Sequence, residues 1–133
     1  MTIAAVADTH AALWHLFDDA RLSAAAGVVI SEAATARRKI AISTIRCRSS
    51  VFGEKNRLPR PAYDELMQAL GDPEHVFAEA VLTASVVQAM RRVSRTEVPD
   101  MPDRIVAATA IYFDVPVISR DRRIRAASLK TIW

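Results

Sequence analysis

Cysteine is nearly missing from this sequence: Cys47 is its single example among 133 residues. A disulfide bond within the chain is therefore excluded, and with it the class of small secreted proteins that disulfides stabilise. The sequence also lacks any apolar run near the roughly 20 residues that cross a bilayer as a helix. The N-terminus has neither the basic region nor the long apolar core of a signal peptide. We therefore expect a cytoplasmic protein without membrane association.

Internal repeats, low-complexity segments and linker-like stretches are absent as well. A chain of this length fits one domain, residues 1–133, and can bury roughly two-thirds of its unfolded surface. Its 51% hydrophobic and 25% charged residues are typical of a globular protein. The formal net charge of +3 mildly favours a polyanionic partner but decides nothing alone.

Short apolar runs alternate along the chain with segments of helical spacing. The apolar runs predict strands at residues 3–7, 40–42, 76–78, 115–118 and 129–133. The helical segments are residues 11–17, 24–38, 62–70, 84–93 and 102–113, although Gly27 and the β-branched residues after it weaken the second. This alternation predicts an α/β fold in which helices cover both faces of a mostly parallel sheet of four to five short strands.

Residues 105–113 of the predicted helix 102–113 are apolar almost all round, which is typical of a buried helix. Pro102 suits its first position, where a missing N–H costs nothing. The helix dipole favours a carboxylate in the first turn, where Asp103 stands. Pro116 excludes further helix, and the buried strand predicted there is followed closely by Asp121.

Asp8 and Asp121 both follow predicted strands. In an open α/β sheet, ligands bind beyond the carboxyl ends of the strands, where the strand order reverses. Each acid also has a structural alternative: Asp8 as a helix cap, and Asp121 as a turn residue or ion-pair partner. Asp103 and Arg104 have a structural alternative as well: a role in helix-end electrostatics together with a surface ion pair. The residues alone do not choose between these alternatives.

Five segments in this order match a known family: residues 7–14 (ADTHAALW), 22–25 (LSAA), 42–45 (ISTI), 99–110 (PDMPDRIVAATA) and 117–124 (VISRDRRI). On these segments the chain resembles PIN-domain ribonucleases, specifically the VapC-like toxins of bacterial toxin–antitoxin pairs. The resemblance implies a PIN-like three-layer sandwich and hydrolysis of RNA with Mg²⁺ or Mn²⁺ held by a cluster of acids. It also implies a homodimer and a cognate VapB-like antitoxin.

By this resemblance Asp8, Asp103 and Asp121 match the first, third and fourth acids of the metal site. We expect Asp8 and Asp103 to bind the ion directly or nearly so, and Asp121 to act through water. Two carboxylates about 4 Å apart repel by about 4 kcal/mol at an effective dielectric near 20, and a divalent cation relieves that repulsion. The expected supports of these carboxylates are Thr9, Ser43 and Ser119.

The sequence departs from the family at the second acid. A Glu is expected after the second strand, and its position falls near Ser49, a neutral and weak ligand. Glu54 lies five residues further on and would point to another face of a helix. The whole run 46–52 lacks an apolar helical face, and we interpret it as the product of a local frameshift, which resequencing tests. Catalysis is therefore open to question.

Three functional hypotheses follow. The first is a metal-dependent endoribonuclease that acts on single-stranded or loop RNA. The second is a catalytically silent PIN domain that binds an antitoxin or RNA. The third, a Mg²⁺-dependent phosphatase or phosphoacceptor domain, ranks last because the residues after Asp8 do not supply its pattern.

Arg120, Arg122 and Arg123 form a basic stretch beside the predicted site. They are either a solvated face or contacts for RNA phosphates. Trp14 and Trp133 are expected in the core or at a dimer interface.

Overall fold

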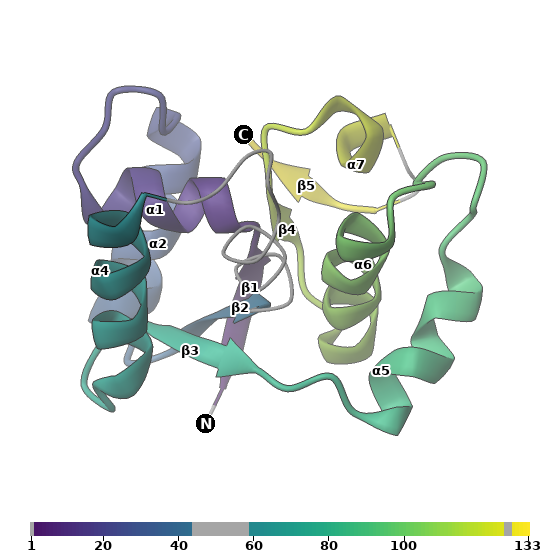
Figure 1. Ribbon diagram of the computed structural model, residues 1–133, viewed down its shortest axis with the longest axis horizontal. Coiled ribbons are helices and arrows are strands. Elements are labelled where there is room, and N and C mark those ends of the chain that lie inside the picture. The colour runs from purple at the N-terminus through teal and green to yellow at the C-terminus, as the bar shows by residue number, and fades with distance from the viewer. Residues whose placement is uncertain (1, 44–58, 127–128) are drawn as a thin grey trace.

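The computed structural model describes residues 2–43, 59–126 and 129–133, and these contain five strands in one sheet (Figure 1). The strands are β1 (Ile3–Ala7), β2 (Lys39–Ser43), β3 (Phe77–Ala80), β4 (Val117–Ile118) and β5 (Thr131–Ile132). Their spatial order is β3-β2-β1-β4-β5, and every neighbouring pair is parallel. The predicted parallel sheet is confirmed, and its strand order reverses between β1 and β4.

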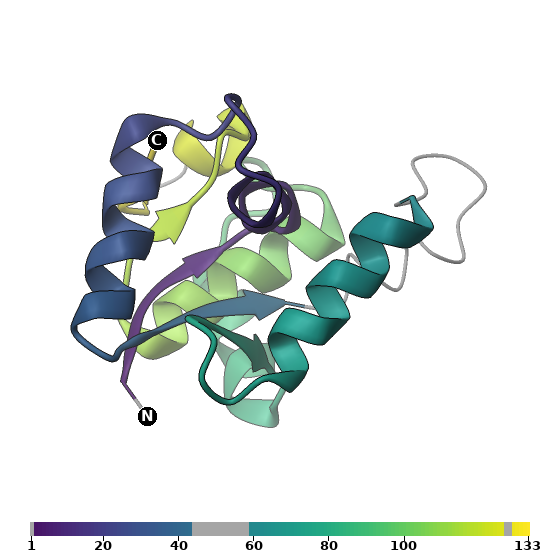
Figure 2. The same ribbon diagram turned by 90° about the vertical axis from the view of Figure 1, so that its left-hand side faces the viewer.

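Helices connect and cover the strands. They are α1 (Thr9–Leu16), α2 (Ala24–Thr35), α4 (Arg60–Gly71), α5 (Ala84–Ala89), α6 (Met101–Phe113), α7 (Arg122–Ala126) and the 3-10 helix η1 (Met90–Arg92). Figure 2 shows α2, α1 and α4 across one face of the sheet, and α6 packs on the opposite face with α5 outside it. The molecule is the three-layer sandwich that was predicted. Of the helices described, none combines the length and the apolar character that crossing a bilayer requires.

The strands send alternate side chains to the two faces, as extended backbone requires. Ile40 and Ile42 pack in the cluster under α1, α2 and α4, whereas Ala41 between them joins the cluster under α6. Val6 and Val117 also face α6. Because both faces are covered, the strands are apolar throughout, which explains why the sequence showed short continuous apolar runs rather than alternation.

Several helix ends differ from the sequence expectation, and two of them have a clear cause. The Asp100 carboxylate accepts a hydrogen bond from the Asp103 amide at 3.2 Å and caps α6, so Met101 opens the helix and Pro102 takes the second position. Helix α2 ends at Thr35 rather than at residue 38, because Arg37 adopts the left-handed conformation with φ of 57°. Asp100 is a strong N-cap type immediately before Met-Pro, a signal that the sequence did contain.

Helix α7 was not predicted. The Asp121 carboxylate opens it by accepting hydrogen bonds from the backbone amides of Arg123 at 2.8 Å and Ile124 at 3.4 Å. Ile124 is fully buried against the α6 side of the sheet. A five-residue helix with one buried position shows no apolar period, so the sequence revealed only its basic character.

Two half-buried histidines contact the ring of Phe77: His15 of α1 and His75 just before β3. Burial lowers the pKa of both imidazoles, and the neighbouring His75 lowers that of His15 further. His75 Nδ1 accepts a hydrogen bond from the Phe77 amide at 3.0 Å, which a proton on that nitrogen would prevent. The folded protein therefore favours neutral histidines here.

We expect the free energy of unfolding to fall as the pH is lowered through about 6.5, because unfolded histidines take up protons before these do. A depressed folded-state pKa stabilises the protein above the unfolded pKa, and that contribution is lost as the pH falls toward the folded pKa. Urea unfolding midpoints at about pH 7.5 and about pH 5.5 measure the loss. His15→Gln should show a smaller drop, whereas His10→Gln, which changes an exposed histidine of the same helix, should keep the full drop. Equal drops in all three proteins would contradict this assignment.

Candidate functional site

Among the described residues, buried polar and charged side chains gather at the carboxyl edge of the sheet and the start of α6. They are Asp8, Thr9, Ser43, Asp103, Arg104 and Ser119, and Thr109 in the middle of α6 is the exception. Figure 1 shows the start of α6 on the same side of the molecule as the ends of β1 and β4. Buried polar groups cost free energy unless they are paired, so their concentration at one edge indicates a functional site.

Asp8 is held from two sides. Its Oδ1 accepts a hydrogen bond from the Ala11 amide at 2.9 Å and thereby caps α1. Its Oδ2 accepts a hydrogen bond from the Ser119 hydroxyl at 2.5 Å. The capping alternative for Asp8 is thus observed, but each carboxylate oxygen has a second lone pair with which it can bind a cation.

Ser119 connects two of the predicted site residues, Asp8 and Asp121, by hydrogen bonds. Its fully buried hydroxyl donates to Asp8 and accepts a hydrogen bond from the Asp121 backbone amide at 3.0 Å. The predicted support of the Asp8 carboxylate by Ser119 is confirmed. The Asp121 carboxylate caps α7, a structural role that differs from the turn-residue and ion-pair alternatives.

Asp103 is buried in the first turn of α6, as expected. The alternative of a surface ion pair between Asp103 and Arg104 does not hold, because Arg104 is only 7% exposed. Its guanidinium donates to the carbonyl oxygens of Val93 and Met90, both at 3.2 Å. A cation is favourable at the carboxyl end of a helix, so Arg104 ties the end of η1 to the start of α6.

The buried carboxylates of Asp8 and Asp103 are suitable ligands for a metal ion, but the described residues do not form a complete set of ligands. Across residues 2–43, 59–126 and 129–133, no group of three or more His, Cys, Asp or Glu side chains could hold one ion. Joint binding by Asp8, Asp103 and Asp121 therefore stays a prediction. Buried carboxylates nevertheless fit Mg²⁺ or Mn²⁺, since Mg²⁺ commonly binds through one or two carboxylates and keeps several waters. Ser49, Glu54 and the run 46–52 lie outside the described residues.

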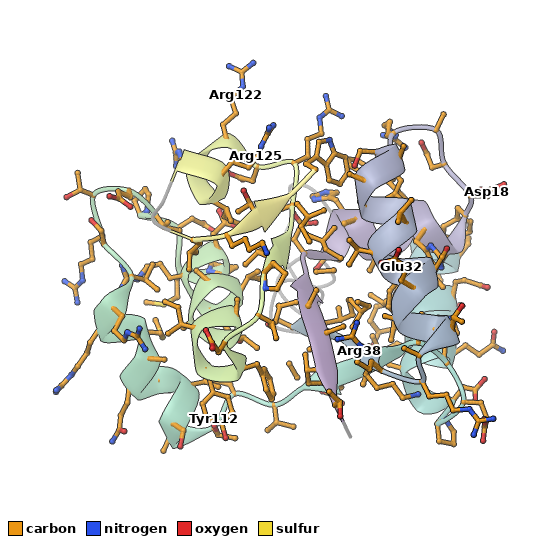
Figure 3. All side chains as sticks on the ribbon, turned by 180° about the vertical axis from the view of Figure 1, so that it is seen from behind. Asp18, Glu32, Arg38, Tyr112, Arg122 and Arg125 are labelled. Carbon is orange, nitrogen blue, oxygen red and sulfur yellow. The ribbon has the colours of Figure 1, made fainter. Side chains whose placement is uncertain are left out.

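The predicted RNA contacts Arg120, Arg122 and Arg123 are all exposed. Figure 3 shows the side chains of Arg122 and Arg125 pointing outward from α7. Helix α7, which carries Arg122 and Arg123, begins three residues after Ser119, and the contact of these arginines with RNA stays a prediction.

A cavity of about 890 Å³ lies between η1 and the start of α6. Arg104 and Met101 line it, together with Arg91 and Arg95. Neither Asp8 nor Ser119 borders it, so we do not assign it to the candidate site.

Comparison with known proteins supports the fold. The sequence matches no protein-family model and no curated protein. A chain in the crystal structure of VapBC2 from Rickettsia felis, bound to a DNA fragment from their promoter, is similar with a TM-score of 0.64. The two chains are 14% identical, and the similarity covers 98% of this chain and 97% of the other. An identity this low establishes the fold alone, and the VapC-like PIN fold implied by the resemblance is confirmed.

Proposed function

We propose that this chain is a metal-dependent endoribonuclease, the VapC-like toxin of a toxin–antitoxin pair. One observation carries the proposal: the buried carboxylate of Asp8 follows β1 at the point where the strand order reverses, and the buried carboxylate of Asp103 lies in the first turn of α6, the helix that packs on β1. Ligands bind at such a point in open α/β sheets. Carboxylates buried there are suited to a divalent ion and its bound phosphodiester.

Each residue has a role in this proposal. Asp8 and Asp103 hold Mg²⁺ or Mn²⁺, and Ser119 fixes the orientation of Asp8. A bound ion would lower the pKa of a coordinated water and stabilise the charge that develops on the phosphodiester. The amide end of α6 favours the same anionic group. Arg120, Arg122 and Arg123 neutralise neighbouring RNA phosphates.

The proposed partners rest on the structural similarity to the VapBC2 chain and on the sequence resemblance to VapC-like toxins. The similar structure is of a VapBC complex, which supports a cognate VapB-like antitoxin for this chain. A homodimer rests on the family resemblance alone.

A catalytically silent PIN domain is the second candidate, and it rests on Ser49. Where the family has a Glu, this sequence has a residue that adds no charge to the site. A domain without that charge would retain its fold and bind antitoxin or RNA without cleaving it.

The test is cleavage of total RNA by the purified chain with Mg²⁺ or Mn²⁺ and with EDTA. We expect cleavage with metal, none with EDTA, and a large loss in Asp103→Asn. Asp64→Asn, which removes an exposed carboxylate from α4, is the matched control and should cleave as the wild type does. Metal-independent cleavage, or equal rates in both variants, would contradict the proposed site.

Ser49→Glu separates the two candidates. We expect it to raise metal-dependent cleavage by about tenfold or more, because it restores a carboxylate that the family uses at the metal. A wild type that is silent and a Ser49→Glu variant that cleaves would support the second candidate. No cleavage by either protein would contradict the enzyme altogether.

A further inference from the structure

One flank of the candidate site carries aromatic rings and guanidinium groups around Trp14. The ring of Trp133 lies 5.6 Å from that of Trp14, and the ring of His10 lies 5.9 Å from it. The Arg21 and Arg120 guanidinium carbons stand 5.2 Å and 5.8 Å from the Trp14 ring centre. We call these five residues the Trp14 cluster.

The cluster borders directly on the Asp8–Ser119 pair. Arg120 is the residue between Ser119 and Asp121, and α1, which carries Trp14, begins beside Asp8. Strands β4 and β5 pair through Ile118 and Ile132, so Trp133 follows at the same sheet edge as Ser119. A chain bound at Asp8 would therefore extend over this cluster.

Arg21 of the cluster is held by an ion pair with Asp19. The Arg21 guanidinium donates to both carboxylate oxygens of Asp19, at 2.8 Å and 3.1 Å. Hydrogen bonds from Arg21 lower the pKa of the Asp19 carboxyl to about 2, so the pair remains ionised at ordinary pH. The Arg21 side chain is nevertheless 62% exposed, and His10 and Arg120 are exposed too. The cluster thus presents guanidinium planes to solvent beside a half-buried indole.

We propose that the Trp14 cluster stacks an unpaired base of single-stranded RNA next to the cleavage site. The inference rests on the proposed function and names the form of RNA that it accepts. Bases of single strands stack on aromatic rings and on arginine planes, and the cations also attract the flanking phosphates. Bases inside a duplex are already stacked and cannot reach such a surface. The cluster therefore selects single strands and loops.

Tryptophan emission tests the contact directly, because the chain has two tryptophans. Trp133→Phe leaves Trp14 as the reporter, and Trp14→Phe leaves Trp133. We expect a mixed-sequence oligoribonucleotide of about twelve nucleotides, added in EDTA to prevent cleavage, to quench Trp14. The same sequence as a duplex should leave the emission unchanged. Equal quenching by both forms, or by neither, would overturn the proposal.

Affinity provides a second readout. Trp14→Leu should weaken binding of the same single strand by about tenfold and leave binding of the duplex unchanged. Tyr112→Leu, which changes a half-exposed aromatic residue near the end of α6, should leave both unchanged. If Trp14→Leu fails to fold, the quenching of the Trp133→Phe protein still decides the question.

The outcomes separate this inference from the proposed function. Metal-dependent cleavage without quenching of Trp14 would overturn the stacking surface and leave the enzyme in place. Quenching by single strands without cleavage would support the stacking surface in a silent domain. Quenching by an acidic peptide but by no RNA would overturn the inference and indicate a protein partner at the cluster.

Discussion

Asp8→Asn should reduce metal-dependent RNA cleavage by at least about 100-fold while leaving the fold intact. Asparagine is as good an N-cap as aspartate and has nearly the same shape, so α1 keeps its hydrogen bond from Ala11. What the change removes is the negative charge, which a hard divalent cation requires, and the oxygen that accepts the Ser119 hydrogen bond, because the amide nitrogen takes the place of Oδ2. The substitution therefore separates the capping role of Asp8, which is observed, from its metal-binding role, which is proposed.

Three measurements check this expectation. The melting temperature should stay near that of the wild type, titration calorimetry should show weaker Mn²⁺ binding, and cleavage should be lost. Asp8→Ala removes the cap as well and should also cost about 1 kcal/mol of stability. Ser119→Ala, which frees one oxygen of Asp8 and removes the acceptor of the Asp121 amide, should cost about tenfold in cleavage. Cleavage by Asp8→Asn at the wild-type rate would show that Asp8 is a cap and nothing more.

The edge of the sheet at which the site lies could be predicted from sequence, but the contacts within it could not. Asp8 and Ser119 are 111 positions apart and meet because β1 and β4 pair with Ala7 opposite Ile118. Asp8 and Ser119, the residues that follow this pair, therefore lie beside each other. An apolar run predicts a strand and its direction, whereas register depends on packing between elements that are distant in sequence.

The contacts of Arg104 are a second example that the sequence could not predict. The sequence left open a surface ion pair for Arg104, because a charged residue is almost never fully buried unless it is paired. Its partners are the carbonyl oxygens of Met90 and Val93. Every residue offers such a carbonyl, so no sequence pattern identifies the two that Arg104 contacts. Asp100, in contrast, was a readable cap, because the residue type and the proline after it are both local signals.

The largest expected effect on stability is that of Phe77→Ala, which should lower the free energy of unfolding by about 3–5 kcal/mol. Phe77 opens the edge strand β3, is 1% exposed, and packs in the core cluster with Ile40, Ile42 and Leu66. Removing the ring leaves a cavity beneath α4, because α4 packs on β3 and its Leu66 lies in the same core cluster as Phe77. A domain of this kind has about 5–15 kcal/mol in total, so the change would remove a large share.

Urea unfolding at about pH 7.5 measures the effect of Phe77→Ala. Val81→Ala, which shortens an exposed side chain just after the same strand, should change stability by less than about 0.5 kcal/mol. A loss below about 1 kcal/mol in Phe77→Ala would show that the core relaxes around the missing ring. Because β3 lies two strands from the Asp8–Ser119 pair, cleavage per folded molecule should be the same in Phe77→Ala as in the wild type. Stability and catalysis should therefore respond to different substitutions, with β3 governing the first and the β1–β4 edge the second.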